Sequence, residues 1–301
     1  MKTNFPFIKY KKIYFIFSGI LIAGSLVSIL AFGLKLGIEF TGCSLIEVEF
    51  EADRPSNDAI EKNLSEFNVG EVVIQPTGDR GAIVRLKEID EQTHQKIILK
   101  LKESFPLEEK RFDLIGPVIG QELRQTTQVA ILLALLAITF YIAIAFRRIS
   151  KPISSWKYGV ASLIALFHDF FIPLGAIAVL GKLYNAEITI PIIAALLTII
   201  GFSVHDTIVI FDRIRENLLK RSFPSFEETV DWSLNQTFGR SINTVLTLLI
   251  VLFSIFLFGG STLKYFSLTL IIGTIAGAYS SIFIASPLLA TWLAWQERRR
   301  V

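Results

Sequence analysis

Six long runs of mainly apolar residues constrain this chain more than any other feature of its sequence. They cover residues 13–34, 127–146, 158–180, 188–211, 241–258 and 266–295. A membrane-spanning helix needs about 20 predominantly apolar residues, and each run carries few charges. The backbone of such a segment satisfies its own hydrogen bonds only as a helix. The sequence therefore predicts an α-helical membrane protein with six transmembrane helices.

The composition supports this prediction. Hydrophobic residues make up 52% of the 301 positions, and 25 of them are Phe. A soluble core of this size could not bury so much apolar side chain, so the surplus must face lipid. The first run is too long for a signal-peptide core and lacks a small-residue cleavage site, so we expect it to remain as an anchor. The single cysteine, Cys43, excludes an internal disulfide.

Basic residues predict the orientation of the spans. Four basic clusters fall on the same side of the membrane, within residues 2–12, 147–157, 213–221 and 298–300. The short loops on the other side carry only Lys182 and Lys264. Because short cytoplasmic loops are enriched in Lys and Arg, we expect both termini in the cytoplasm and segment 36–125 outside it.

Segment 36–125 has the periodicities of a small soluble domain. Ile46, Val48 and Phe50 alternate with glutamates, which predicts a half-buried strand. Apolar residues at helical spacing predict helices within 60–67 and 97–105. Two strands are predicted at 72–74 and 82–86, on either side of the turn 78–81, and a last strand at 112–115. The order of these elements predicts a ferredoxin-like α+β domain over residues 36–125. Residues 1–35 precede it and contain the first span, and residues 126–301 follow it and contain the other five.

The loop between the fourth and fifth spans contains a helix signal. Ser225 and Glu228 form a capping box, and apolar residues then repeat every four positions at 226, 230, 234 and 238. This pattern predicts an amphipathic cytoplasmic helix that lies on the membrane surface or against neighbouring helix ends. The alternative is a helix that only connects two spans.

Ionisable residues inside the predicted spans are the strongest functional candidates, because each costs about 2.5–3.5 kcal/mol on the insertion scale. His168 and Asp169 lie in the third span, and His205 and Asp206 lie in the fourth. Arg240 begins the fifth span, and a polar stripe continues from it at helical spacing through residues 243, 244, 247 and 254. We expect this stripe to face other helices or a file of water.

These five residues allow two interpretations. Burial favours the protonated form of a carboxyl group and a nearby arginine favours its ionised form, so the two together can load and release a proton. The functional hypothesis is a proton relay through Asp206 and Arg240, with His168, Asp169 and His205. The structural alternative is an ion pair of Asp206 with Arg240 that only locks helices together. Adjacent helical residues point about 100° apart, so we expect His168 and Asp169 not to face one partner.

Signals for enzymatic chemistry are lacking in this sequence. It has no phosphate-binding loop of the G-x-x-x-x-G-K-[ST] type, no H-E-x-x-H motif and no paired cysteines. We therefore expect no enzyme activity, no metal, no cofactor and no nucleic-acid partner. His94 stands alone on a polar helix face, and we predict that it is solvated.

Several short segments, in order along nearly the whole chain, carry recognisable motifs. Residues 37–42, G-I-E-F-T-G, and residues 115–123 contain the signature positions Gly37, Phe40, Thr41, Gly42, Gly116, Pro117 and Gly120. Residues 165–169 read A-L-F-H-D, and residues 201–217 read G-F-S-V-H-D-T-I-V-I-F-D-R-I-R-E-N, which includes Asp212 and Arg213. Segments 235–242 and 279–287 complete the pattern. Together they resemble the SecD/SecF family of bacterial translocation factors, within the resistance-nodulation-division superfamily, and in particular its smaller half.

The resemblance implies a function and partners. Asp206 and Arg240 would be the pair that the family uses in proton conduction, opposite a carboxylate of SecD. The proton motive force would drive protein translocation across the cytoplasmic membrane, in a complex with SecD, the SecYEG channel and YajC. The outer domain would act on the secreted polypeptide, with membrane lipid around the spans. Cys43 departs from the second glycine of the family signature, and His205 from the usual Asn.

Two other function classes remain open from sequence. A half-transporter of the same superfamily would export lipid or small molecules, although such exporters usually carry two large outer loops. A membrane sensor would need a signalling output, and little of this chain faces the cytoplasm. Six spans form half of a pseudo-symmetric transporter, so a partner half is expected. Gly273 and Gly277 allow close helix approach, either inside the chain or against that partner.

Overall fold

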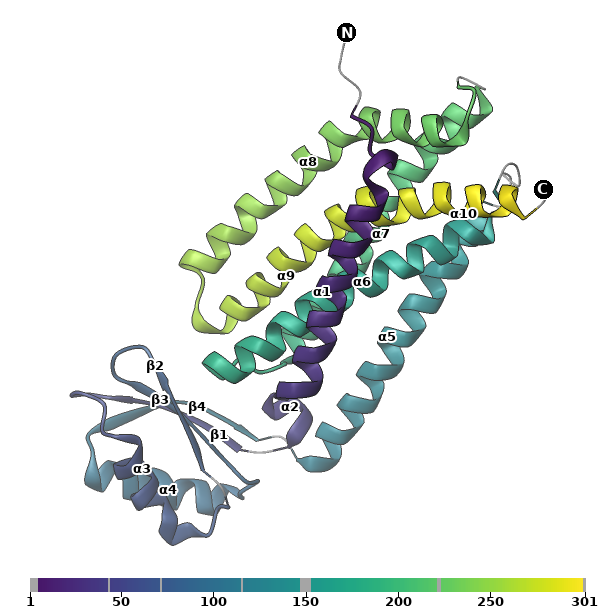
Figure 1. Cartoon of the computed structure of the whole chain (residues 1–301). Helices are drawn as coiled ribbons and strands as arrows, with labels where there is room; N and C mark the ends of the chain where they lie inside the picture. Colours follow the sequence, from purple (N-terminus) through teal and green to yellow (C-terminus); the bar gives the residue numbers. More distant parts are fainter. Residues whose placement is uncertain are drawn as a thin grey trace. The chain divides into compact units, whose positions relative to one another are not determined.

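A computed structural model describes residues 5–42, 44–70, 72–114, 116–146, 153–220 and 223–299 (Figure 1). Contacts between Cα atoms separate two units: Leu36–Val129 forms one, and the chain up to Lys35 together with the chain from Ala130 onward forms the other. Cys43 and Ile115 lie outside the described residues, as do Lys2, Arg147, Arg148, Lys151, Arg221 and Arg300 of the basic clusters.

The smaller unit is a four-stranded antiparallel sheet with two helices on one face (Figure 1). Its elements are α2 (Ile38–Thr41), β1 (Ser44–Phe50), α3 (Asn57–Leu64), η2 (Ser65–Phe67), β2 (Val73–Thr77), β3 (Gly81–Leu86), α4 (Glu91–Ser104) and β4 (Leu107–Leu114). The sheet order is β2-β3-β1-β4, and every neighbouring pair is antiparallel. The predicted ferredoxin-like fold is therefore confirmed.

The alternating pattern of β1 builds the core of this unit. Ile46 and Val48 are fully buried, while Glu49 between Val48 and Phe50 is exposed. Each helix begins at a side-chain cap, since Ser56 accepts from Ala59 N and Asp90 accepts from Thr93 N. The hydrogen bonds from Thr93 lower the pKa of Asp90, so the cap stays ionised in mildly acidic solution. The last strand begins at Leu107 rather than near residue 112.

The prediction that His94 is solvated is wrong. Its side chain is buried at 3% exposure, and its ring stacks on Phe112 of β4 with centroids 3.7 Å apart. Its Nε2 lies 2.7 Å from Glu109 and its Nδ1 lies 3.2 Å from Glu91. The physical reason is helical spacing: residue 94 precedes 97, 98 and 101 on the same apolar face of α4, which packs against the sheet.

The larger unit contains the spans. Its elements are η1 (Ile8–Tyr10), α1 (Lys11–Phe32), the end of α5 (Pro117–Ala145), α6 (Trp156–Tyr184), α7 (Ile190–Leu219), α8 (Phe226–Phe258), α9 (Ser261–Ser280), the π-helix η3 (Ser281–Ala285) and α10 (Ser286–Arg298). Within the described residues, six helical stretches are long and apolar enough to cross a membrane, and the last of them runs from Leu263 to Arg298 through α9, η3 and α10. The predicted number of spans is confirmed.

The last span lies at the centre of its unit. In this span, 67% of the most apolar 18-residue stretch is buried. In the spans formed by α1 and α5, only 6% of the corresponding stretch is buried. Two glycines let α9 approach α7 closely: a Cβ at Gly273 would strike Ile199, and one at Gly277 would lie 3.0 Å from Ser203 Cβ. The glycine pair therefore serves an internal interface, which the sequence left open.

The capping box at Ser225 is confirmed, but it begins a longer helix than predicted. Ser225 Oγ accepts from Glu228 N at 3.2 Å, and α8 then continues unbroken to Phe258. No separate loop helix precedes the fifth span, because residues 226–258 contain no proline and the single glycine, Gly239, is tolerated inside the helix. Val230 and Leu234 are buried in the core with α6, α7 and α10, so this stretch packs against neighbouring helix ends.

Candidate functional site

Asp206 lies on α7 at the contact with α8. Pro191 in the first turn favours the start of α7, and the capping box fixes the start of α8. Asp206 Oδ1 accepts a hydrogen bond from Ser241 Oγ at 2.6 Å. Its Oδ2 is buried and has no hydrogen-bond partner among the described residues. One oxygen of this carboxyl group is therefore fixed, while the other is available to bind a proton or a cation.

Arg240 precedes Ser241 on α8 and is exposed. In the described part of the chain no ion pair joins its guanidinium to Asp206. The locked ion pair that the sequence allowed as an alternative is not formed in this structure. The two residues are neighbours through Ser241, which follows Arg240 in the chain and donates to Asp206.

Arg240 also lines a polar cleft of about 190 Å³ between α7 and α8. The other lining residues are Val209, Asp212, Arg213, Glu216, Gln236 and Thr237. Arg213 donates to Glu216 at 2.7 Å, and Asp212 lies 3.5 Å from Arg215. The motif residues Asp212 and Arg213 are thus placed beside Arg240 by the last turns of α7. This cleft is wide enough for water and brings solvent up to the guanidinium.

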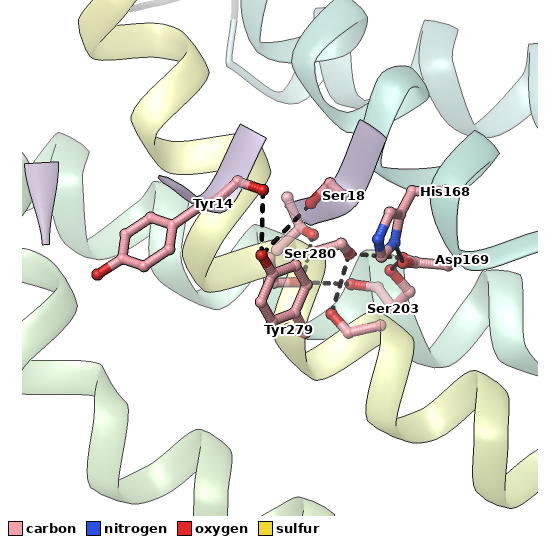
Figure 2. Close-up of polar contacts among 10 residues, drawn as sticks. Tyr14, Ser18, His168, Asp169, Ser203, Tyr279 and Ser280 are labelled. Carbon is pink, nitrogen blue, oxygen red and sulfur yellow. Dashed lines mark hydrogen bonds and ion pairs between the residues drawn. The ribbon is translucent and has the colours of Figure 1, made fainter. Parts of the chain in front are cut away.

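Asp169 on α6 is the centre of what we call the interior cluster: His168, Asp169, Ser203 and Ser280 (Figure 2). Asp169 is fully buried, and its Oδ2 accepts from Ser203 of α7 and, at 2.7 Å, from Ser280 of α9. Its Oδ1 lies 2.9 Å from His168 Nδ1. Three helices are therefore joined at one carboxylate, and each of its contacts is a hydrogen bond.

His168 and Asp169 contact each other rather than a common partner, since Asp169 bonds Ser203 and Ser280 while the His168 ring lies beside Tyr279. Their Cα–Cβ bonds diverge, but the imidazole turns back along α6 onto the neighbouring carboxylate. An ionised carboxylate only accepts, so in that state of Asp169 the hydrogen of the contact is on Nδ1. His168 Nε2 is buried, and none of the described residues forms a hydrogen bond with it.

Sequence reasoning missed the hydroxyl groups of both sites. Ser281 Oγ and Thr207 Oγ1 lie 2.8 Å apart and extend the polar contacts of the interior cluster between α7 and η3. The signal was present, since Ser203 and Thr207 are four residues apart in one span and serines follow one another at 280 and 281 in another. Small hydroxyl residues at such spacing commonly join transmembrane helices.

The five predicted relay residues do not form one contact network in the described chain. His168 and Asp169 pair with each other, Asp206 pairs with Ser241, and His205 is exposed on α7. Ser203 and Asp206 are three residues apart on α7 and belong to the two different sites. This helix is therefore the physical connection between the interior cluster and Asp206.

The two glycine-containing motifs meet in the smaller unit. Gly42 adopts a φ of 68°, which favours glycine, and Thr41 Oγ1 donates to Gly37 O at 3.2 Å. A Cβ on Gly120 would lie 3.0 Å from Gly42 N and 3.2 Å from the Phe40 carbonyl. Gly116 has more room, with Glu88 Oε1 at 3.6 Å from an added Cβ, and α5 begins at Pro117. The motifs thus build one tight turn against the start of α5.

A cofactor site is not evident from side chains. The described residues contain no group of three His, Cys, Asp or Glu side chains arranged to hold a metal ion. The chemistry that the two acidic sites can perform with their own groups is proton binding and exchange.

Comparison with known proteins identifies the family. The family model described as protein export membrane protein SecD/SecF, C-terminal, matches residues 96–295, and the SecD/SecF GG motif matches residues 27–53. The protein translocase subunit SecF of Thermobaculum terrenum is 42% identical over 95% of this chain and 93% of its own length. SecF of Rickettsia prowazekii is 38% identical over 100% of this chain and 94% of its own length.

Solved structures agree with this assignment. The crystal structure of SecDF from Thermus thermophilus, described as a translocon-associated membrane protein, is 32% identical and covers 97% of this chain with a TM-score of 0.84. SecDF in its super-membrane-facing form is also 32% identical, with a TM-score of 0.70. This chain spans only 39% and 40% of those two SecDF chains. On the family models and the near-full-length relatives together, the chain belongs to the SecD/SecF family, as a SecF-type subunit of the protein translocase.

Proposed function

We propose that this subunit pairs with SecD in the cytoplasmic membrane and uses the proton motive force to assist translocation through the Sec channel. The observation that carries the proposal is the half-satisfied carboxyl group of Asp206 next to Arg240. Oδ2 is buried without a hydrogen-bond partner among the described residues, and Arg240 is exposed nearby. A structural ion pair would have both groups engaged.

The arrangement supports a two-state proton cycle. In one state Asp206 carries a proton on Oδ2, and Arg240 points into the polar cleft that it lines. In the other state the guanidinium approaches the carboxylate and stabilises its charge, so the proton leaves. Ser241 holds Oδ1 in both states, because a serine hydroxyl can donate to a neutral or an ionised carboxyl group. The cleft supplies water on one side of the membrane.

The basic clusters support the proposal that this side is the cytoplasm. The cleft lies among the last turns of α7 and the first turns of α8, and the loop between these helices belongs to the predicted cytoplasmic set. In this orientation both termini are cytoplasmic and the ferredoxin-like domain works outside, on the secreted polypeptide. Protons entering from outside would leave through the cleft.

The polar stripe on α8 faces outward, which supports a partner protein that provides the other half of a pseudo-symmetric transporter. Asn243, Thr244 and Thr247 are all exposed, as is Ser254 further along. The hydroxyls bond carbonyls of their own helix, for example Thr244 Oγ1 to Arg240 O at 3.0 Å, so they need no other partner from this chain. Polar side chains in a span are better accommodated against protein or water than against lipid. We infer that SecD covers this stripe and provides the opposing carboxylate, with SecYEG and YajC as further contacts of the complex.

Co-purification tests the partner directly. Solubilised in mild detergent, the tagged chain is expected to recover a SecD-type protein in equal amount. Thr247→Arg should reduce that recovery strongly, because a charge would enter the contact, whereas Ile20→Arg on the exposed side of α1 serves as the matched control. Repeated failure to recover SecD would instead favour a solitary half-transporter.

Inverted membrane vesicles test the use of the proton gradient. Vesicles that lack their own SecF are expected to regain gradient-dependent completion of translocation when this chain and SecD are supplied together. The measurement is protease protection of a late translocation intermediate, with and without an imposed pH gradient. Equal recovery in the absence of any gradient would contradict the proposal.

A further inference from the structure

Tyr279 connects the interior cluster to α1. It immediately precedes Ser280, and its ring lies beside the imidazole of His168, with centroids 5.7 Å apart and planes at 23°. Its hydroxyl donates to the main-chain carbonyl of Tyr14 at 3.2 Å. Ser18 Oγ donates to the same hydroxyl at 3.4 Å. Figure 2 shows the dashed lines from the Tyr279 hydroxyl to Tyr14 and to Ser18, with His168 and Asp169 on the right.

Among the described residues, this contact is one of two polar contacts that attach α1, the other being the ion pair of Lys11 with Glu227 of α8 at 2.8 Å. Most side chains of α1 are exposed, and Ser18 is the buried residue of this helix. Aromatic rings surround the contact: Phe17 lies 5.6 Å from Tyr279, and Tyr14 lies 4.7 Å from Phe283. Along the chain, α1 leads directly to the segment that begins the outer domain. The backbone therefore connects α1 to that domain.

The hydroxyl of Ser280 has two acceptors and one proton. It lies 2.7 Å from Asp169 Oδ2 and 3.1 Å from the carbonyl of Gly277, and it can donate to only one of them at a time. An ionised Asp169 takes the hydrogen bond. A protonated Asp169 instead donates to Ser280, whose own proton then turns to Gly277. The interior cluster thus has two hydrogen-bond states, which differ at the residue next to Tyr279.

Few other charges act on this cluster. The neighbours in hydrogen-bond or ring contact with it are Ser203 from α7, Tyr279 from α9 and, behind Tyr279, Tyr14 and Ser18 from α1. Of these only the tyrosines are titratable, and within the described chain no second charged side chain bonds to Asp169 or His168. The charge state of the pair therefore depends on its own protons, with His168 Nε2 as a second place to bind one.

The π-helix η3 begins directly after Ser280 and gives this part of the span room to adjust. A π-helical turn inside a longer helix is rare, and such segments often occur at functional sites. Pro287 follows shortly and lacks the N–H that an α-helix would use. A rearrangement at Ser280 can therefore be absorbed in η3 while α10 stays in place.

We propose that Tyr279 is a positioning residue that passes the protonation state of the interior cluster to α1, and through α1 to the outer domain. The inference rests on the proposed proton-driven function, but it concerns a separate step, the coupling of proton uptake to movement. Tyr279 is suited to this step because its ring contacts His168 while its hydroxyl is bonded to a main-chain group of α1.

Tyr279→Phe in the full complex with SecD tests the coupling. The ring contacts with His168, Phe17 and Phe283 remain, and only the hydroxyl is lost. Proton uptake and completed translocation are measured in the same vesicles, with a pH-sensitive dye and protease protection. We expect nearly normal uptake and a fall of about fivefold in translocation per proton, the effect of losing one hydrogen bond. Tyr265→Phe is the matched control, because its hydroxyl, also on α9, lies 3.4 Å from the Tyr184 carbonyl.

The outcomes separate the two proposals. An unchanged ratio in Tyr279→Phe, or an equal fall in Tyr265→Phe, would overturn the coupling role. A parallel loss of uptake and translocation would also overturn it, since that is the mark of a purely structural residue. If Tyr279→Phe does not accumulate, Ser18→Ala removes the donor from α1, and a wild-type ratio there overturns the proposal. A wild-type complex that takes up no protons would contradict the proposed function itself.

Discussion

Asp206→Asn is expected to abolish the gradient-dependent part of translocation while the chain stays inserted and bound to SecD. The amide oxygen of Asn can still accept the hydrogen bond from Ser241, so the contact between α7 and α8 persists. The side chain can no longer ionise, so it cannot exchange a proton. Folding should not suffer, because an ionisable group in a span costs about 2.5–3.5 kcal/mol on the insertion scale and an amide costs less.

The measurement compares late-stage translocation in vesicles with and without an imposed pH gradient. Late-stage translocation with the variant should be no greater than in vesicles that lack the subunit. The variant should nevertheless be present at normal levels in the membrane and recover SecD normally. Glu297→Gln is the control, since it also removes one carboxylate but from an exposed position on α10, away from both acidic sites. Normal gradient-dependent translocation by Asp206→Asn would show that Asp206 is not a proton relay.

Much of the fold follows from local patterns in the sequence. The six spans are visible because each is a continuous apolar stretch, and a stretch of this length has few alternatives to a membrane helix. The ferredoxin-like domain is visible because the alternation around Val48 and the helical spacing around Ile97 have different periods. The capping box at Ser225 predicted the start of α8, although not that the helix would continue through the fifth span.

The candidate site was only partly visible, because its contacts join distant helices. Asp206 and Arg240 stand out as charges in apolar sequence, and the structure places them near each other through Ser241. The interior cluster depends on α6, α7 and α9 meeting, and no local period shows that Ser203 and Ser280 bond the same carboxylate. His94 differs, because its signal was local: residues 94, 97, 98 and 101 share one buried face of α4.

Arg240→Met is expected to remove gradient-dependent translocation almost as completely as Asp206→Asn. Without a guanidinium to stabilise the ionised carboxylate, Asp206 stays protonated and the cycle stops after one proton has bound. Stability should change by no more than about 0.5 kcal/mol, because Arg240 is exposed and no ion pair in the described chain depends on it. Thermal unfolding of the purified complex and the vesicle assay together measure both effects.

Two further variants decide why Arg240 is needed. Arg240→Lys keeps the positive charge on a shorter, more strongly hydrated group, so partial activity is expected if the charge itself drives release of the proton. Arg298→Met removes an arginine from an exposed position on α10 and should leave translocation unchanged. A stable and fully active Arg240→Met complex would show that the arginine is dispensable for proton release. The carboxyl group would then have to exchange protons through groups of SecD alone, and the cleft between α7 and α8 would have no part in the path.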